Sequence, residues 1–215
     1  MKRFIIILFF YSTVFIQVAA VQKNAYYMFE EFQDAIVYFQ GGIRSQAKVN
    51  YNLMDGIIYF IDQEDGLVKI VTNVDKITVI KIGERNFITV KGGIQEVMPT
   101  TPPIYVQYRV KTKMKAQKGA YGTVTETSSI TTYSGINAGK PYHIQEREFE
   151  ATGRYNTYWI EKNGKKIQFL DLKQFLKIYP KHKDALDSYI KSNSIDFNET
   201  NTIVALCLYA ENLDN

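Results

Sequence analysis

The chain has 215 residues, of which 46% are hydrophobic, and a formal charge of +4 at pH 7. This length and composition suit one large domain or two small ones with a real core, and so modest a charge gives no argument for nucleic-acid binding. The single cysteine, Cys207, excludes a disulfide within the chain, so burial of apolar surface must stabilise the fold.

Residues 1–20 have the order of features of a secretory signal peptide. Lys2 and Arg3 precede the unbroken apolar run of residues 4–10, and small residues close the segment at 18–20. A cationic start, an apolar run and small residues in this order are typical of a cleaved export signal. A retained membrane anchor is the alternative, but the apolar stretch only reaches the lower limit for spanning a bilayer. We therefore expect cleavage and no retained transmembrane helix.

The expected mature chain is residues 21–215. Loss of Lys2 and Arg3 lowers its formal charge from +4 to +2. An exported protein of this size without disulfides fits a bacterial cell envelope better than an animal extracellular space. We expect it in the periplasm, at the outer membrane or cell surface, or secreted.

Residues 35–116 predict a series of antiparallel strands. Short β-rich runs alternate with Gly-Gly, Asp-Gly and Asn-containing turns, whose residues tolerate the positive φ that tight hairpins require. The expected strands are residues 35–40, 43–54, 57–61, 67–72, 76–82, 87–91, 94–98 and 104–116. We predict that residues 21–116 form an antiparallel β-meander sheet, or a partly closed barrel, of seven or eight strands.

The segment Asp62-Gln63-Glu64-Asp65-Gly66 places three carboxylates within five residues. An EF-hand needs oxygen ligands at positions one, three and five, glycine at six and glutamate at twelve. Counted from Asp62, glycine stands fifth and Asn73 stands twelfth. The spacing therefore favours a hairpin turn over a calcium loop, with a weak surface cation site as the alternative.

Residues 104–116 alternate between an apolar face and a basic face. Four basic residues, named here the cationic strip, share the second face: Arg109, Lys111, Lys113 and Lys115. In a single strand they would lie about 7 Å apart. The strip is a candidate binding site for an acidic glycan, a lipid head group or an acidic partner. The alternative is a solvated edge strand, where lysines discourage sheet-to-sheet association.

The second half of the chain has a different character. Residues 117–141 are rich in Gly, Ser and Thr and predict a long surface loop. In residues 142–215 we expect a hairpin followed by helices that pack on the sheet domain, which makes the fold class α+β. The expected elements are a hairpin of residues 155–162 and 165–170 with an Asn-Gly turn, then helices at 172–179 with Asp171 as N-cap, at 181–193, and after an Asn198 cap. Cys207 falls within the apolar surface of the third helix, which favours a core residue over a nucleophile.

The C-terminal pattern is also familiar. Residues 158–197 read Y-W-I-E-K-N-G-K-K-I-Q-F-L-D-L-K-Q-F-L-K-I-Y-P-K-H-K-D-A-L-D-S-Y-I-K-S-N-S-I-D-F, and residues 118–123 read K-G-A-Y-G-T. These stretches resemble an uncharacterised group of exported proteins common in Bacteroidota-type bacteria, in which a hairpin leads to a short helix, a Tyr/Phe-Pro stop and a charged helix. The group has no assigned activity, so the resemblance implies an envelope location and no catalytic residues.

Catalytic motifs are scarce. His143 and His182 lie in no His-Glu-x-x-His pattern, and the chain has no Gly-x-Ser-x-Gly elbow. His143, Glu146 and Glu148 are candidate acid/base residues, because a pair of carboxylates on one strand face is what a glycosidase uses. Such pairs are also ordinary on exposed strands.

The leading hypothesis is a non-enzymatic binding or structural module that recognises a protein partner or an anionic envelope component. It needs no cofactor and no metal. The alternative is an envelope hydrolase that acts on glycan or peptide through His143, Glu146 and Glu148.

Overall fold

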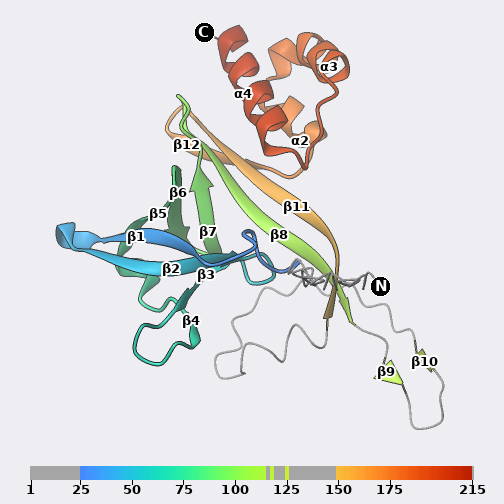
Figure 1. Ribbon diagram of the computed structural model, residues 1–215. Helices are drawn as coiled ribbons and strands as arrows, with labels where there is room; N and C mark the ends of the chain where they lie inside the picture. The colour runs from blue at the N-terminus through green and yellow to red at the C-terminus, as the bar shows by residue number, and fades with distance from the viewer. Residues whose placement is uncertain (1–24, 115–116, 119–123, 126–148, 215) are drawn as a thin grey trace, which may run out of the picture.

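The computed structural model describes residues 25–114, 117–118, 124–125 and 149–214. Ten strands of this part form one antiparallel sheet in the order β12-β11-β8-β7-β6-β5-β1-β2-β3-β4, and three α-helices follow it in the chain (Figure 1). The predicted α+β class is therefore confirmed. The predicted signal peptide, and all of the 117–141 segment except two short strands, lie outside the described residues.

The first eight strands follow one another closely in sequence, as the turn dipeptides predicted. They are β1 (Gln33–Phe39), β2 (Arg44–Asn52), β3 (Ile57–Ile61), β4 (Val68–Ile70), β5 (Ile77–Ile82), β6 (Arg85–Val90), β7 (Gly93–Val97) and β8 (Ile104–Met114). The long hairpin of β11 (Phe149–Lys162) and β12 (Lys165–Phe169) continues the same sheet beyond β8, while β9 (Gln117–Lys118) and β10 (Val124–Thr125) pair only with each other. Short 3-10 turns η1 (Gln40–Gly42) and η2 (Val74–Lys76) separate β1 from β2 and β4 from β5.

The sheet curls but does not close. Its hydrogen-bonded order ends at β12 and β4. However, the turn between β2 and β3 reaches across to the other side, where Ile94 N donates to Gly56 O at 2.9 Å and Val110 N donates to Leu53 O at 3.0 Å. The close approach requires glycine, because a Cβ on Gly93 would lie 2.6 Å from Gly56 O and its φ is +136°. The curled sheet encloses an apolar core whose buried residues come mainly from β1, β2, β3, β5, β6 and β7.

Apolar residues alternate with polar ones in residues 43–54, and the alternation predicts an inner face that is only partly confirmed. Val49 and Tyr51 of β2 and the following Leu53 are at most 1% exposed, whereas Ile43 is 67% exposed. The alternating polar residues predict a solvated opposite face, which is wrong for Asn50 and Asn52, because both are buried. The N-terminal segment covers them: Asn50 Nδ2 donates to Phe29 O at 2.9 Å, and Phe29 N donates to Asn50 Oδ1 at 3.2 Å.

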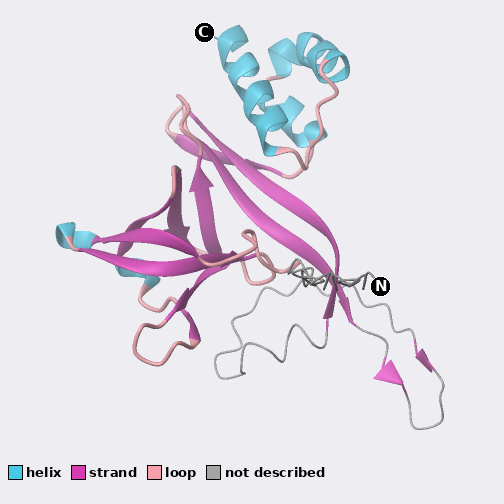
Figure 2. Cartoon of the chain, viewed as in Figure 1, coloured by secondary structure: helices cyan, strands magenta, loops and turns pink. Residues whose placement is uncertain are grey.

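The helices build a second core on β8, β11 and β12. They are α2 (Leu172–Ile178), α3 (Lys183–Ser192) and α4 (Thr200–Asp214), with the 3-10 turn η3 (Pro180–His182) between α2 and α3; Figure 2 shows them grouped at one end of the β8–β11 ribbon. Buried members of this core include Val106, Ile160 and Phe169 from the sheet and Phe175, Leu186, Leu206 and Cys207 from the helices. Cys207 is thus a core residue, as predicted, and burial raises the pKa of its thiol.

Two helix N-caps were predicted, with different outcomes. Asp171 caps α2, since its Oδ1 accepts a hydrogen bond from Gln174 N at 2.6 Å. The prediction for Asn198 is wrong: α4 begins at Thr200, and the Asn198 side chain donates to Asp196 Oδ1 at 3.4 Å instead. Within the described ranges, no helix is both long and apolar enough to cross a membrane.

Candidate functional site

A cleft of about 600 Å³ lies where the sheet meets the start of α4. We call it the α4 cleft. Its lining comes from distant parts of the chain: Met28, the β2–β3 turn, strands β6, β7, β8 and β11, and residues 198–201 that lead into α4. The residues that determine its chemistry are Arg85, Glu96, Tyr108, Arg154, Asn156 and Glu199.

Arg85, Glu96 and Tyr108 form an internally neutralised group in this cleft. Arg85 Nε and Nη2 donate to the two carboxylate oxygens of Glu96, both at 2.7 Å, and Tyr108 Oη donates to Glu96 Oε2 at 2.5 Å. Burial, and then the charge of Glu96, raise the pKa of Tyr108. Burial alone would lower the pKa of Arg85, but its hydrogen bonds and attraction to Glu96 leave it raised. Glu96, 5% exposed, is therefore held by three donors and serves to join β6, β7 and β8.

A chain of neutral hydrogen bonds ties β11 to the segment before α4. Asn156 Nδ2 donates to Tyr158 Oη and to Asn198 O, both at 2.9 Å, and Tyr158 Oη donates to Phe197 O at 3.0 Å. Asn156 stands opposite Tyr108 in the β8–β11 register. These bonds fix the position of α4 over the sheet and hold the wall of the cleft.

Arg154 is the exposed cation of the cleft. It lies two residues before Asn156 on the same face of β11, because alternate strand residues share a face, and it is exposed. Its Nη2 donates to Tyr27 O at 3.3 Å. Among the described residues its guanidinium forms no ion pair with a carboxylate. Its five donors, arranged in a planar fork, suit a carboxylate or a phosphate.

The described residues of the cationic strip, Arg109, Lys111 and Lys113, do not form a single row of exposed charges. Arg109 borders the α4 cleft, but its side chain leaves β8 on the face opposite Tyr108. Its guanidinium donates to Met54 O at 3.0 Å and to Gly92 O at 3.1 Å, which holds the β2–β3 turn against the β6–β7 turn. Arg109 therefore has a structural task that its position in the sequence did not reveal.

The other strip residues lie further along β8. Lys111 is exposed. Lys113 pairs with Glu150 of β11 at 3.2 Å, with more than half of each side chain exposed. Lys115 lies outside the described residues. An exposed ion pair of this kind contributes little to stability. Anion binding by Lys111, Lys113 and Lys115 stays a prediction.

The segment at Asp62–Gly66 is a turn, as its spacing predicted. Gly66 N donates to Asp62 O at 2.9 Å, and Asp62 N donates to Leu67 O at 2.9 Å. The ammonium of Lys69 pairs with Asp62 and, at 2.8 Å, with Asp65. Hydrogen bonds from Lys69 hold the pKa of both carboxyls below the usual range. Over the described ranges, no group of three His, Cys, Asp or Glu side chains is arranged to hold a metal ion.

The hydrolase candidates His143, Glu146 and Glu148 lie outside the described residues, so that alternative also stays a prediction. His182 lies in the helical part, where its Nε2 is 3.4 Å from Asp214. Lys162 pairs with the same carboxylate at 2.7 Å and lowers the pKa of Asp214 through that hydrogen bond. This cluster joins the β11–β12 hairpin to the end of α4.

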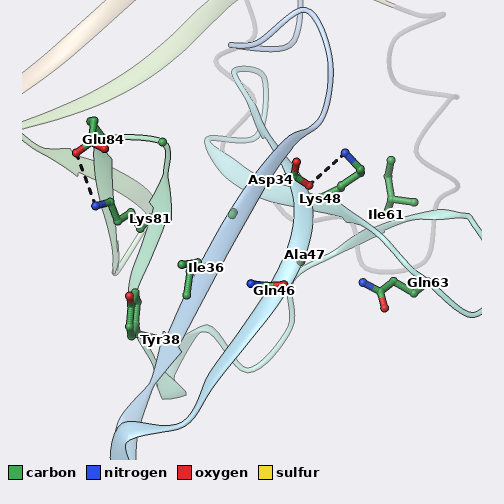
Figure 3. A pocket seen from close by; sticks show the side chains of 12 residues that line it. Asp34, Ile36, Tyr38, Gln46, Ala47, Lys48, Ile61, Gln63, Lys81 and Glu84 are labelled. Atoms are coloured by element: carbon green, nitrogen blue, oxygen red, sulfur yellow. Dashed lines mark ion pairs between the residues drawn. The ribbon is translucent and has the colours of Figure 1, made fainter.

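A second hollow, of about 740 Å³, lies on the face of β1 that carries Ile36 and Tyr38 (Figure 3). Its charged side chains pair with one another: Lys48 lies 3.2 Å from Asp34, and Lys81 lies 3.7 Å from Glu84. Among the described residues that line it, both cations therefore have a carboxylate partner. The α4 cleft, with Arg154 exposed at its edge, is the better candidate for binding a charged ligand.

Comparison of the chain with protein-family models, with curated proteins and with solved structures found no match. The chemistry of the α4 cleft therefore has to be inferred from its own residues.

Sequence reasoning missed most of this cleft. Arg85, Glu96 and Asn156 come from three strands, and the α4 start is more than 40 residues beyond the last of them. One signal was present: Arg154 and Asn156 stand on the same side of a strand as Tyr158 and Ile160. Two polar residues that continue a buried face indicate a site at the edge of a core.

Proposed function

We propose that the chain is an exported protein of a bacterial cell envelope that binds a partner, and that its α4 cleft receives an anionic group of that partner. The order of features in residues 1–20 supports export. The resemblance of residues 158–197 to exported proteins of Bacteroidota-type bacteria supports a periplasmic, outer-membrane or surface location.

The exposed guanidinium of Arg154 is the observation that carries the proposal. Arg85, the neighbouring cation, is neutralised by Glu96 at two distances of 2.7 Å. Arg154 donates only to a backbone carbonyl among the described residues. An anion that approaches the cleft therefore meets one arginine whose donors are not held by a carboxylate. The buried side chains around it are fixed by hydrogen bonds, so the wall of the site is already in place.

Recovery of partners from the envelope tests the proposal. Cells that express the tagged full chain, or a variant, are crosslinked, and the material recovered with each protein is identified by mass spectrometry. Arg154→Ser should lose the partner or anionic component. Arg44→Ser, which removes an exposed arginine on β2 away from the cleft, should retain it.

A third variant, with Lys111, Lys113 and Lys115 changed to serine, separates the cleft from the cationic strip. Arg109 is left intact because its loss would disturb the β2–β3 turn. Retention by this variant supports the cleft. Equal recovery by Arg154→Ser and the wild type would contradict the proposal, and loss from the lysine variant alone would move the binding site to β8.

A further inference from the structure

Asn156 presents an acceptor to the α4 cleft that no described residue uses. The residue is 7% exposed and lines the cleft. Its amide nitrogen donates to Tyr158 Oη and to Asn198 O, and since a backbone carbonyl only accepts, these bonds determine which side-chain atom is the nitrogen. Among the described residues, Asn156 Oδ1 accepts no hydrogen bond. Asn156 Oδ1 is not among the fully enclosed side-chain atoms of the described residues that lack a partner, so it is reachable from the cleft.

The cleft therefore combines an anion site with acceptors for hydrogen-bond donors. Arg154 and Asn156 are alternate residues of β11, about 6.6–6.8 Å apart along the strand. Glu199, an exposed carboxylate, lines the same cleft from the α4 side. A ligand that satisfies all three must carry a negative group together with O–H or N–H donors a few ångströms away.

We propose that the ligand of the α4 cleft is an acidic saccharide, whose carboxylate binds Arg154 and whose hydroxyls donate to Asn156 Oδ1 and Glu199. This inference rests on the anion site proposed above. A sugar acid holds a carboxylate and several hydroxyls on one rigid ring, so both contacts form without ordering a flexible chain. Met28 and Leu53 give the cleft an apolar wall for the C–H surface of a ring.

The remaining lining suits a hydroxyl-rich ligand better than a peptide. Asn198, Thr200 and Asn201 line the α4 side of the cleft. Amides and hydroxyls both donate and accept, as sugar hydroxyls do. The volume of about 600 Å³ falls within the range of small-molecule sites, roughly 300–1,000 Å³.

Calorimetric titration of the purified exported protein tests the inference, with a linear trimer of galacturonate as the probe. The wild type should bind it. The fully methyl-esterified trimer, which keeps the ring but loses the charge, should bind at least tenfold more weakly, because a bidentate charge-assisted contact is lost. Arg154→Ser should weaken binding of the acidic trimer by a similar factor, and Arg44→Ser should leave it unchanged.

The role of Asn156 needs a comparison that a folding defect cannot imitate. A trigalacturonate whose hydroxyls are O-methylated keeps its carboxylates but loses its donors. The wild type should prefer the free trimer over this analogue at least fivefold, and Asn156→Ala should show a clearly smaller preference, since one of the two acceptors is gone and Glu199 remains. An unchanged preference in Asn156→Ala would overturn the assignment of Asn156.

Triglutamate, an anionic peptide without hydroxyls, separates failure of the saccharide inference from failure of the anion site. Equal affinity for triglutamate and trigalacturonate, with both lost in Arg154→Ser, leaves the anion site standing and overturns the saccharide. Binding of neither probe by the folded wild type, or binding that Arg154→Ser does not weaken, overturns both.

Discussion

Replacement of Glu96 by glutamine should strongly destabilise the protein. The carboxylate accepts hydrogen bonds from Arg85 at 2.7 Å and 2.7 Å and from Tyr108 at 2.5 Å. A glutamine of similar size has one carbonyl oxygen and one NH₂ group, so it places a donor against donors and leaves the arginine without a counter-charge.

The expected loss follows from the burial of the pair. Removal of one partner from a buried ion pair costs about 3–5 kcal/mol. The Arg85 side chain is 35% exposed, so water solvates part of its charge once the carboxylate is lost. We therefore expect a loss of about 2–3 kcal/mol, and a fall in Tm of roughly 5–10 °C for a chain of this size.

Urea unfolding measures this loss as a lower midpoint at an unchanged m-value. Glu84→Gln is the matched control. Its carboxylate pairs with Lys81 at 3.7 Å, but the side chain is 98% exposed, so a change within about 0.5 kcal/mol is expected. A loss below about 1 kcal/mol for Glu96→Gln would refute the argument that this group joins β6, β7 and β8.

Three further predictions concern the turn contact, the tyrosines and Arg109. Gly93→Ala should lower the free energy of unfolding in urea by much more than Gly92→Ala does. Both glycines have positive φ, but only at Gly93 would a Cβ meet a backbone atom, at 2.6 Å. Equal losses in the two variants would contradict the close approach. Burial is the main cause that raises the pKa of Tyr51, Tyr108 and Tyr158 above the usual 10.0. The free energy of unfolding should therefore be full below about pH 10 and fall as the pH rises further, because the unfolded chain loses these protons first. Urea midpoints measured across that range check this, and midpoints that do not change with pH would contradict it. Arg109→Met should lower the free energy of unfolding by about 1–3 kcal/mol through loss of its hydrogen bonds to Met54 O and Gly92 O. Lys111→Met, at an exposed position, should leave the free energy of unfolding nearly unchanged. Similar shifts in Tm for the two variants would show that Arg109 is not a structural residue.

The strands of the first half were predictable because their signals are local. Gly41-Gly42, Asp55-Gly56 and Gly92-Gly93 mark turns by residues that adopt positive φ, and all six but Asp55 do so here. Burial on the second face of β2 was not predictable. It depends on residues 25–32, which bond to Asn50 from a segment with no regular pattern of its own.

The α4 cleft depends on contacts that no local pattern contains. Tyr108 and Thr200 are 92 residues apart, yet their hydroxyls come within 3.5 Å. Arg109 illustrates the opposite problem. Alternation along β8 placed it correctly on a basic face, but only the fold brings the carbonyls of Met54 and Gly92 to its guanidinium. A row of like charges in a sequence therefore says which face the residues share, but not which of them is already bound.

Mapping trigalacturonate onto the protein by two-dimensional NMR tests the central claim most directly, because it locates the binding site as well as detecting it. The proposed site predicts saturable shifts in the backbone amides of residues 154–156 and 198–201 and in the guanidinium of Arg154. In Arg154→Ser the amide shifts at 198–201 should need at least tenfold more trigalacturonate to saturate. Shifts confined to Lys111 and Lys113, or cleft shifts that saturate at the same concentration in Arg154→Ser, would contradict it.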